Sequence, residues 1–93
     1  MLKITLESSD GAFIDAAAKE LAARHYAIVL QATVAQAATP ASGGRGPTQR
    51  LSLTATLTGR FGTSDVDETT TLCARYLRHG NVTCSNSATY SSP

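Results

Sequence analysis

The segment RLSLTATLT, residues 50–58, alternates apolar and hydroxyl-bearing side chains more regularly than any other part of the chain. Successive side chains of a β-strand point to opposite faces of the sheet, so this segment predicts a strand with Leu and Ala buried and Ser and Thr exposed. β-Branched threonine suits an exposed strand face. A sheet with one apolar face requires a second layer to cover it, and we expect the rest of the chain to supply that layer.

Strands and helices of matching pattern lie on both sides of this segment. Strands are expected over residues 2–7, 26–35 and 82–85, and helices over residues 12–25 and 65–79. The helix over 65–79 is expected to begin with a capping pair, Ser64 and Asp67, and to end before Gly80. The inward stripes of the two helices are Ile14, Ala17, Ala18, Leu21 and His25 in the first and Val66, Thr69 or Thr70, Cys73, Tyr76 and Leu77 in the second.

The order strand, helix, strand, strand, helix, strand predicts an α+β fold of the ferredoxin-like, split βαβ kind (βαββαβ). One antiparallel sheet would carry two helices on one face. If the last strand does not form, the alternative is βαββα. We expect a single domain over residues 1–86, interrupted by a flexible Gly- and Pro-containing loop at 38–48 and followed by a polar tail at 87–93.

Composition excludes several classes of protein. The chain has 93 residues, a formal net charge of +1 and only 16% charged residues. This balance excludes a strongly basic nucleic-acid binder and a strongly acidic DNA mimic unless the charges are segregated on the surface. No apolar run is long enough to cross a membrane, and the first residues lack the features of a signal peptide, so we expect a cytoplasmic protein without a membrane partner.

No motif for catalysis, a cofactor or a metal is present. The first strand–helix junction has neither the arginine of acylphosphatases nor the Cys-x-x-Cys of heavy-metal-binding domains, and no aromatic residue on strands 2–7 and 50–58 offers the stacking platform of RNA-recognition modules. Arg60 precedes a helix N-terminus, but no general base accompanies it. The sequence therefore predicts a protein that is not an enzyme and that has no cofactor.

The two cysteines and the two histidines have structural interpretations. Cys73 and Cys84 both fall on inward-facing positions, where a disulfide is sterically allowed. We expect two reduced core cysteines, because reducing thiol pools keep most cytoplasmic cysteines unpaired. His25 and His79 each end a helix, where an imidazole interacts favourably with unpaired carbonyl groups.

Two surfaces remain as candidates for binding: the Thr/Ser face of the sheet and the Gly/Pro loop. The candidate partner-binding residues are Arg45, Arg50, Thr54, Thr56 and Arg60. They favour a small protein-binding module whose partner is a host protein or protein complex, for example a phage or mobile-element inhibitor of the anti-CRISPR type. The alternative is an RNA- or ribosome-associated domain that binds through an arginine patch, in which Arg45, Arg50 and Arg60 would join Arg75 and Arg78. The sheet face also allows a homodimer.

Overall fold

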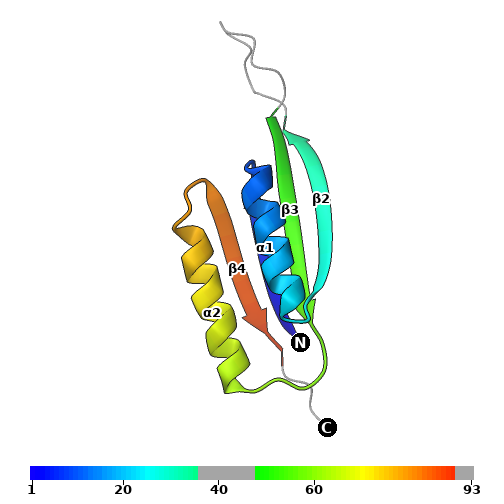
Figure 1. The fold of residues 1–93 in the computed structure, drawn as a ribbon, viewed down its shortest axis with the longest axis vertical. Coiled ribbons are helices and arrows are strands. Elements are labelled where there is room, and N and C mark those ends of the chain that lie inside the picture. Colours follow the sequence, from blue (N-terminus) through cyan, green and yellow to red (C-terminus); the bar gives the residue numbers. More distant parts are fainter. Residues whose placement is uncertain (36–47, 90–93) are drawn as a thin grey trace, which may run out of the picture.

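The computed structural model describes residues 1–35 and 48–89 and contains four strands and two helices (Figure 1). The elements follow one another as strand, helix, strand, strand, helix, strand. Their bounds are β1 Leu2–Ser8, α1 Gly11–Ala23, β2 Ala27–Ala35, β3 Thr48–Leu57, α2 Thr63–Leu77 and β4 Val82–Ala88. The presence of β4 rules out the alternative βαββα order.

All four strands form one antiparallel sheet in the order β2-β3-β1-β4. β1 and β3 are central, and β2 and β4 are the edges. Ile4 lies opposite Ala55 of β3 on one side and Asn86 of β4 on the other. The backbone beyond β4 continues this pairing, because the Thr89 N–H donates to the Met1 carbonyl at 2.8 Å. The fold is therefore α+β, as expected.

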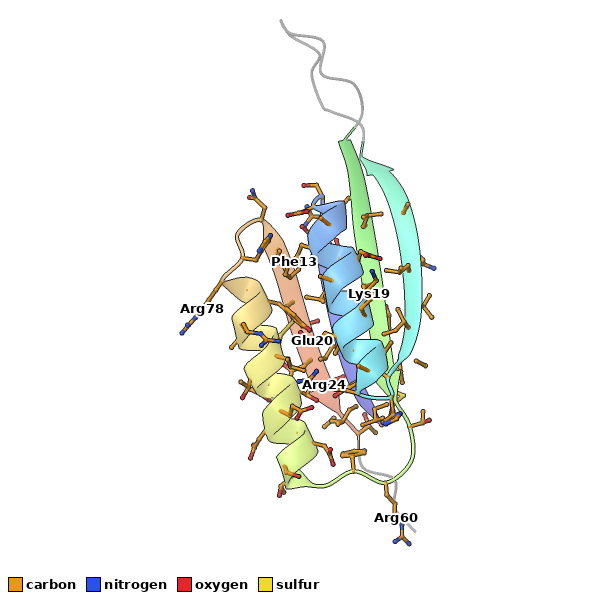
Figure 2. The ribbon with its side chains drawn as sticks, in the orientation of Figure 1. Phe13, Lys19, Glu20, Arg24, Arg60 and Arg78 are labelled. Carbon is orange, nitrogen blue, oxygen red and sulfur yellow. A yellow bond between two sulfur atoms is a disulfide. The ribbon has the colours of Figure 1, made fainter. Side chains whose placement is uncertain are left out.

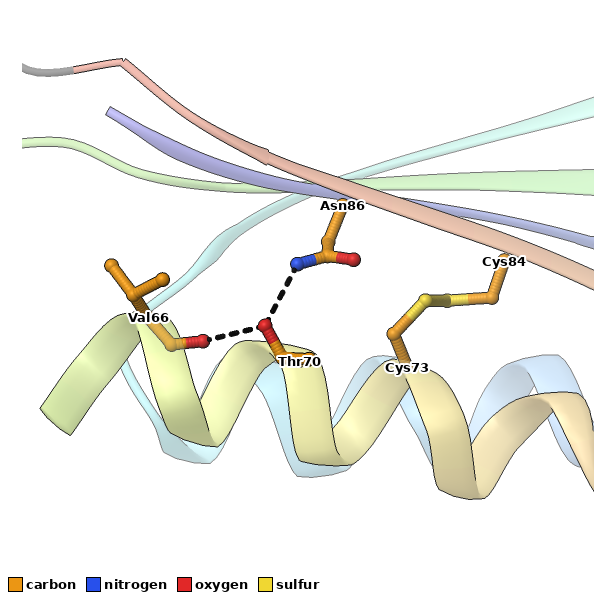
Figure 3. Close-up of a disulfide and its surroundings, with 5 residues drawn as sticks. All are labelled: Val66, Thr70, Cys73, Cys84 and Asn86. Atoms are coloured by element: carbon orange, nitrogen blue, oxygen red, sulfur yellow. Dashed lines mark hydrogen bonds between the residues drawn. A yellow bond between two sulfur atoms is a disulfide. The ribbon is translucent and has the colours of Figure 1, made fainter. Parts of the chain in front are cut away.

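Both helices lie on the same face of the sheet (Figures 1 and 3). The alternate residues of β1 that point toward them, Leu2, Ile4 and Leu6, are almost completely buried. The buried apolar residues that complete this core are Ile14, Ala17, Leu21, Tyr26, Leu53, Ala55, Leu72, Tyr76 and Val82. The period-of-two pattern in β1 and β3 thus selects the covered face, and neither of the two described helices lies on the opposite face.

The helix ends differ from the sequence expectation in detail. Asp10 caps α1, because its Oδ1 accepts a hydrogen bond from the Phe13 N–H at 3.1 Å. α2 begins two residues earlier than expected, at Thr63, and its cap pairs the Gly62 N–H with Asp65 Oδ2 at 2.8 Å. Gly80 follows α2 with φ of 89°, the left-handed conformation expected there.

Three expectations about inward-facing or terminal residues were wrong. His25 does not continue the stripe of α1, because the helix ends at Ala23 and His25 is exposed with φ of 71°. Leu77, which was expected on the buried face of α2, is 49% exposed, and Leu72, which was not expected there, is buried. Ser87 and Ala88 belong to β4 and not to a tail, because both pair with β1. The expected loop at 38–48 lies outside the described residues except for Thr48, which begins β3.

Cys73 and Cys84 form a disulfide that ties α2 to β4, with their Cα atoms 5.7 Å apart (Figure 3). The expectation of two reduced cysteines is therefore wrong, although their inward placement is correct. The expectation rested on the cellular compartment and not on geometry. One turn away, the Asn86 side-chain amide donates to Thr70 Oγ1 at 3.3 Å, and Thr70 Oγ1 donates to the Val66 carbonyl at 3.0 Å. These contacts hold β4 against α2.

Candidate functional site

The side of the sheet opposite the two helices is called the open face here. It consists of the strand residues that alternate with the buried ones. Its members among residues 1–32 and 50–89 are Lys3, Thr5, Glu7, Ala27, Val29, Gln31, Arg50, Ser52, Thr54, Thr56, Thr83, Ser85 and Ser87. Seven of these thirteen residues are Ser or Thr. The open face is thus a hydroxyl-rich surface built from all four strands.

The strand register arranges this face in rows that run across the sheet. Val29, Thr54, Thr5 and Ser85 form the central row, one residue from each strand. The neighbouring rows are Gln31, Ser52, Glu7 and Thr83 on one side and Ala27, Thr56, Lys3 and Ser87 on the other. A threonine side chain presents both a methyl group and a hydroxyl group, so these rows combine apolar contact with hydrogen bonding.

The open face carries little net charge. Lys3, Glu7 and Arg50 are its only ionisable side chains on the described strands, and their formal charges sum to +1. Arg50 Nε lies 3.3 Å from Glu7 Oε2, so two of the three charges already form an ion pair. A partner could therefore cover the central row, which contains no charged side chain, without removing an isolated charge from water. Removing such a charge from water is costly.

The structure brings together only part of the predicted binding set. Arg50, Thr54 and Thr56 share the open face, on β3. Arg60 follows β3 in an exposed turn and points away from the sheet at the opposite end from Arg50 (Figure 2). The part of β3 from Arg50 to its end at Leu57 alone spans about 23 Å. Arg45 lies outside the described residues.

The proposed arginine patch is not assembled on the described part of the chain. Arg75 bonds to Glu20 on the helical side of the sheet. Arg78 projects from the end of α2 (Figure 2). Arg50 is on the other side of the sheet, paired with Glu7. Arg50, Arg75 and Arg78 thus point in different directions and do not form one patch.

A cleft between α1 and α2 was not expected from the sequence. Its volume is about 460 Å³, and Phe13, Ala17, Glu20, Arg75 and Tyr76 are among its lining residues. Volume alone would suit a small ligand. The chemistry of its walls decides whether the cleft is a site, because a binding pocket needs polar groups that are not already bonded to one another.

The polar groups of this cleft are largely bonded to one another. The carboxylate of Glu20 accepts hydrogen bonds from the Tyr76 hydroxyl and from Arg75 Nη2, and Arg24 Nη1 lies 3.8 Å away. Partial burial acts to raise the pKa of Glu20, but the hydrogen bonds from Tyr76 and Arg75 outweigh it and lower that pKa. Burial, followed by the bond to Glu20, raises the pKa of Tyr76. Glu20 is thus an ionised carboxylate of α1 that links the two helices through its hydrogen bonds to α2.

A second contact between α2 and α1 involves His79 and Phe13, which also line this cleft. His79 Nε2 lies 3.0 Å from Asp10 Oδ2, and the imidazole stacks on Phe13 with ring centroids 4.2 Å apart. Phe13 also meets Tyr76 edge to face at 5.6 Å. The expected capping role of His79 is replaced by this contact between the end of α2 and the start of α1. Sequence spacing offers no signal for it, because the partners are 69 residues apart.

No arrangement for metal binding appears within residues 1–35 and 48–89. In these ranges no group of three or more His, Cys, Asp or Glu side chains could hold a metal ion. None of the described helices is both long and apolar enough to span a membrane.

Comparison with known proteins gives no match. No protein-family model fits the chain, and neither the curated proteins nor the solved structures include a significant relative. The function must therefore be inferred from the surfaces described above, the open face of the sheet and the cleft between α1 and α2.

Proposed function

We propose that the chain is a non-enzymatic protein-binding module that meets its partner through the open face of the sheet. The observation that carries this proposal is the register of the hydroxyl rows. Central residues of the face, such as Thr5, Thr54 and Thr56, are half-buried by their neighbours and need little ordering when a partner covers them. A partner with a flat and mostly uncharged surface fits such a face.

A protein partner suits the open face better than a nucleic acid. Phosphate backbones are bound mainly by clusters of Lys and Arg, and each contact contributes to a steep dependence of affinity on salt. The open face offers only Lys3 beyond the Arg50–Glu7 pair. The RNA-associated alternative would need arginines that the described structure holds on separate sides of the molecule.

Three narrower statements accompany this proposal, on the fold class, the kind of inhibitor and the location. We assign the split βαβ, ferredoxin-like class because the order β2-β3-β1-β4, read from the other edge, places the two central strands, β1 and β3, at the starts of the two βα halves. That the chain is an inhibitor of phage or mobile-element origin, of the anti-CRISPR type, which occludes a host protein complex, stays a prediction. A cytoplasmic location also stays a prediction, and the Cys73–Cys84 disulfide favours an oxidising compartment instead.

The test compares two double variants as baits in nuclease-treated lysate of the natural host. Thr54→Arg with Thr56→Arg places two charges in the middle of the open face, and we expect it to reduce recovery of the stoichiometric partner at least tenfold. Thr63→Arg with Thr71→Arg adds the same charges on exposed positions of α2 and should retain the partner. Equal recovery with both variants would exclude the open face, and loss of the wild-type partner after nuclease treatment would favour the nucleic-acid alternative.

A further inference from the structure

β2 is an edge strand with an open hydrogen-bonding side. It pairs with β3 along Ala27–Ala35, and no other described strand lies on its outer side (Figure 1). An unpaired strand edge presents a row of N–H and C=O groups that matches another extended chain. The natural ligand of such an edge is therefore a β-strand.

The sequence of β2 lacks the features that usually protect an edge. Its nine residues, AIVLQATVA, contain no charge and no proline. Val29 and Leu30 are 54% and 53% exposed, and they point to opposite faces of the strand. An incoming strand would cover both side chains as well as the backbone edge. The other edge strand, β4, has mainly small polar side chains and carries no such apolar pair.

A second copy of β2 satisfies these conditions. When two identical strands pair antiparallel around a two-fold axis perpendicular to the sheet, residues of equal parity meet, so open-face residues meet open-face residues. Val29 then lies among open-face residues of the other copy, and Leu30 among residues on its helical side. The absence of charge from β2 means that the two copies bring no like charges together.

We propose that β2 pairs with β2 of a second copy, joining two four-stranded sheets into one continuous sheet of eight strands. This pairing is isologous and closes on itself, so it ends at a dimer. Pairing of β2 with β4 of another copy would leave free edges and would continue into a fibre. The contact area of two strand edges is below that of standard stable interfaces, so we expect a dissociation constant in the micromolar range.

The inference does not rest on the proposed function, although the two are compatible. The two-fold axis places the open faces of both copies on the same side, which would double the available binding surface. If the chain does not dimerise, the open face of a single copy is unchanged, so the proposed function does not fail with the dimer.

Sedimentation equilibrium of the purified chain, from about 10 to 500 µM, tests the proposal. We expect a monomer–dimer equilibrium that Leu30→Lys weakens at least tenfold, because a lysine on an edge strand opposes strand addition. The matched control is Ser85→Lys, an exposed position on the other edge strand, which should change the dimerisation constant less than twofold. Circular dichroism of both variants verifies that each is folded.

Single cysteines introduced separately at Val29, Leu30 and Gln31 provide the second arm. One of these variants should form an intermolecular disulfide on mild oxidation, because one residue pair lies on or beside the two-fold axis. A cysteine at Ser85 should form none. A monomer at every concentration, a species larger than a dimer, or equal weakening by Leu30→Lys and Ser85→Lys would overturn the proposal.

Discussion

The hydroxyl of Tyr26 belongs to a buried chain of hydrogen bonds in the core. It donates to Thr69 Oγ1 at 2.6 Å, and Thr69 Oγ1 in turn donates to the Asp65 carbonyl at 2.9 Å. Thr69 is fully buried, so neither hydroxyl has water as an alternative partner. This short chain of hydrogen bonds joins the entry to β2 with the middle of α2.

Thr69→Val should therefore destabilise the protein by about 1–3 kcal/mol, because it leaves the buried Tyr26 hydroxyl without its acceptor. Thr71→Val is the matched control: Thr71 makes the same hydroxyl bond to a helix carbonyl but is exposed. Its effect should stay within about 0.5 kcal/mol. Urea denaturation of both variants measures the difference, and equal effects would show that the Tyr26 contact contributes nothing.

Asp10 makes the stability of α1 depend on pH. The hydrogen bond from His79, followed by that from the Phe13 N–H, lowers the pKa of Asp10 below its ordinary value of 3.8. A carboxyl with a lowered folded-state pKa contributes stability that is fully present above the ordinary value and is lost as the pH falls through the lowered one. The contribution should therefore disappear at acid pH, below about 4.

The variant Asp10→Asn distinguishes the hydrogen bond that Asp10 accepts at the start of α1 from the negative charge that it places beside His79. Asparagine is as good an N-cap as aspartate, so the bond to Phe13 is retained while the charge facing His79 is lost. We expect a smaller loss of unfolding free energy between pH 5 and pH 2 than in the wild type, measured by urea titration at each pH. Asp15→Asn, on the exposed side of the same helix, serves as the control for removing one surface carboxylate. An unchanged acid slope in Asp10→Asn would contradict this account.

At the scale of elements, two glycines at helix ends respond to the same substitution with opposite sign. A methyl group on Gly11 would meet Leu51 Cδ1 at 3.6 Å, an ordinary contact, whereas Gly80 has a positive φ that side chains rarely adopt. Gly11→Ala should stabilise by about 0.5 kcal/mol and Gly80→Ala should destabilise by about 1–2 kcal/mol. Thermal unfolding of both variants checks the pair; a stabilising Gly80→Ala would mean that the turn rearranges.

The disulfide stabilises the α2–β4 unit by restricting the unfolded chain. Cys73 and Cys84 are separated by 11 positions, and a closed loop of this size corresponds to about 3 kcal/mol. Cys73→Ala with Cys84→Ala should lower the unfolding free energy by that order while leaving the open face, and hence partner binding, intact. A reducing agent should lower the melting temperature of the wild type and leave that of the double variant unchanged. Equal sensitivity of the two proteins would indicate that the bond does not form in solution.

Local sequence patterns predicted the elements better than the contacts between them. The alternation in β1 and β3 and the glycine that follows α2, Gly80, are local signals, and each led to the correct element. β4 was harder to delimit, because its second half is Ser-Asn-Ser-Ala and gains its strand conformation from pairing with β1. Tertiary pairing, and not propensity, decides such a segment.

The candidate site shows the same division. The shared face of Thr54 and Thr56 follows from a period of two, which is visible in the sequence. The contacts of Glu20 with Arg75 and Tyr76, and of Asp10 with His79, depend on how α1 and α2 are placed on the sheet. The spacing of residues in the sequence does not encode that placement. The arginines looked like one group because they flank β3 and α2 in the chain, yet their directions are set by which side of the sheet each element occupies.

For the whole molecule, the position of a strand in the sheet predicts how slowly its backbone amide hydrogens exchange with solvent. β1 and β3 are paired on both sides, and Ile4, Leu6, Leu53 and Ala55 are completely buried. We expect the amides of β1 and β3 to exchange most slowly and the outward amides of β2 to exchange fastest among the strands. Hydrogen-exchange mass spectrometry at low protein concentration tests this order, and slower exchange in β2 than in β1 would contradict it.

The Cys73–Cys84 bond also sets a mechanical limit. When the chain is pulled from its C-terminal end, β4 can detach from β1 only as far as Cys84 before the load passes through the sulfur bridge into α2. The 11 residue steps between the two cysteines then cannot extend, which shortens the released contour length by about 40 Å compared with the reduced protein. The bond thus makes α2 and β4 a single load-bearing unit under tension.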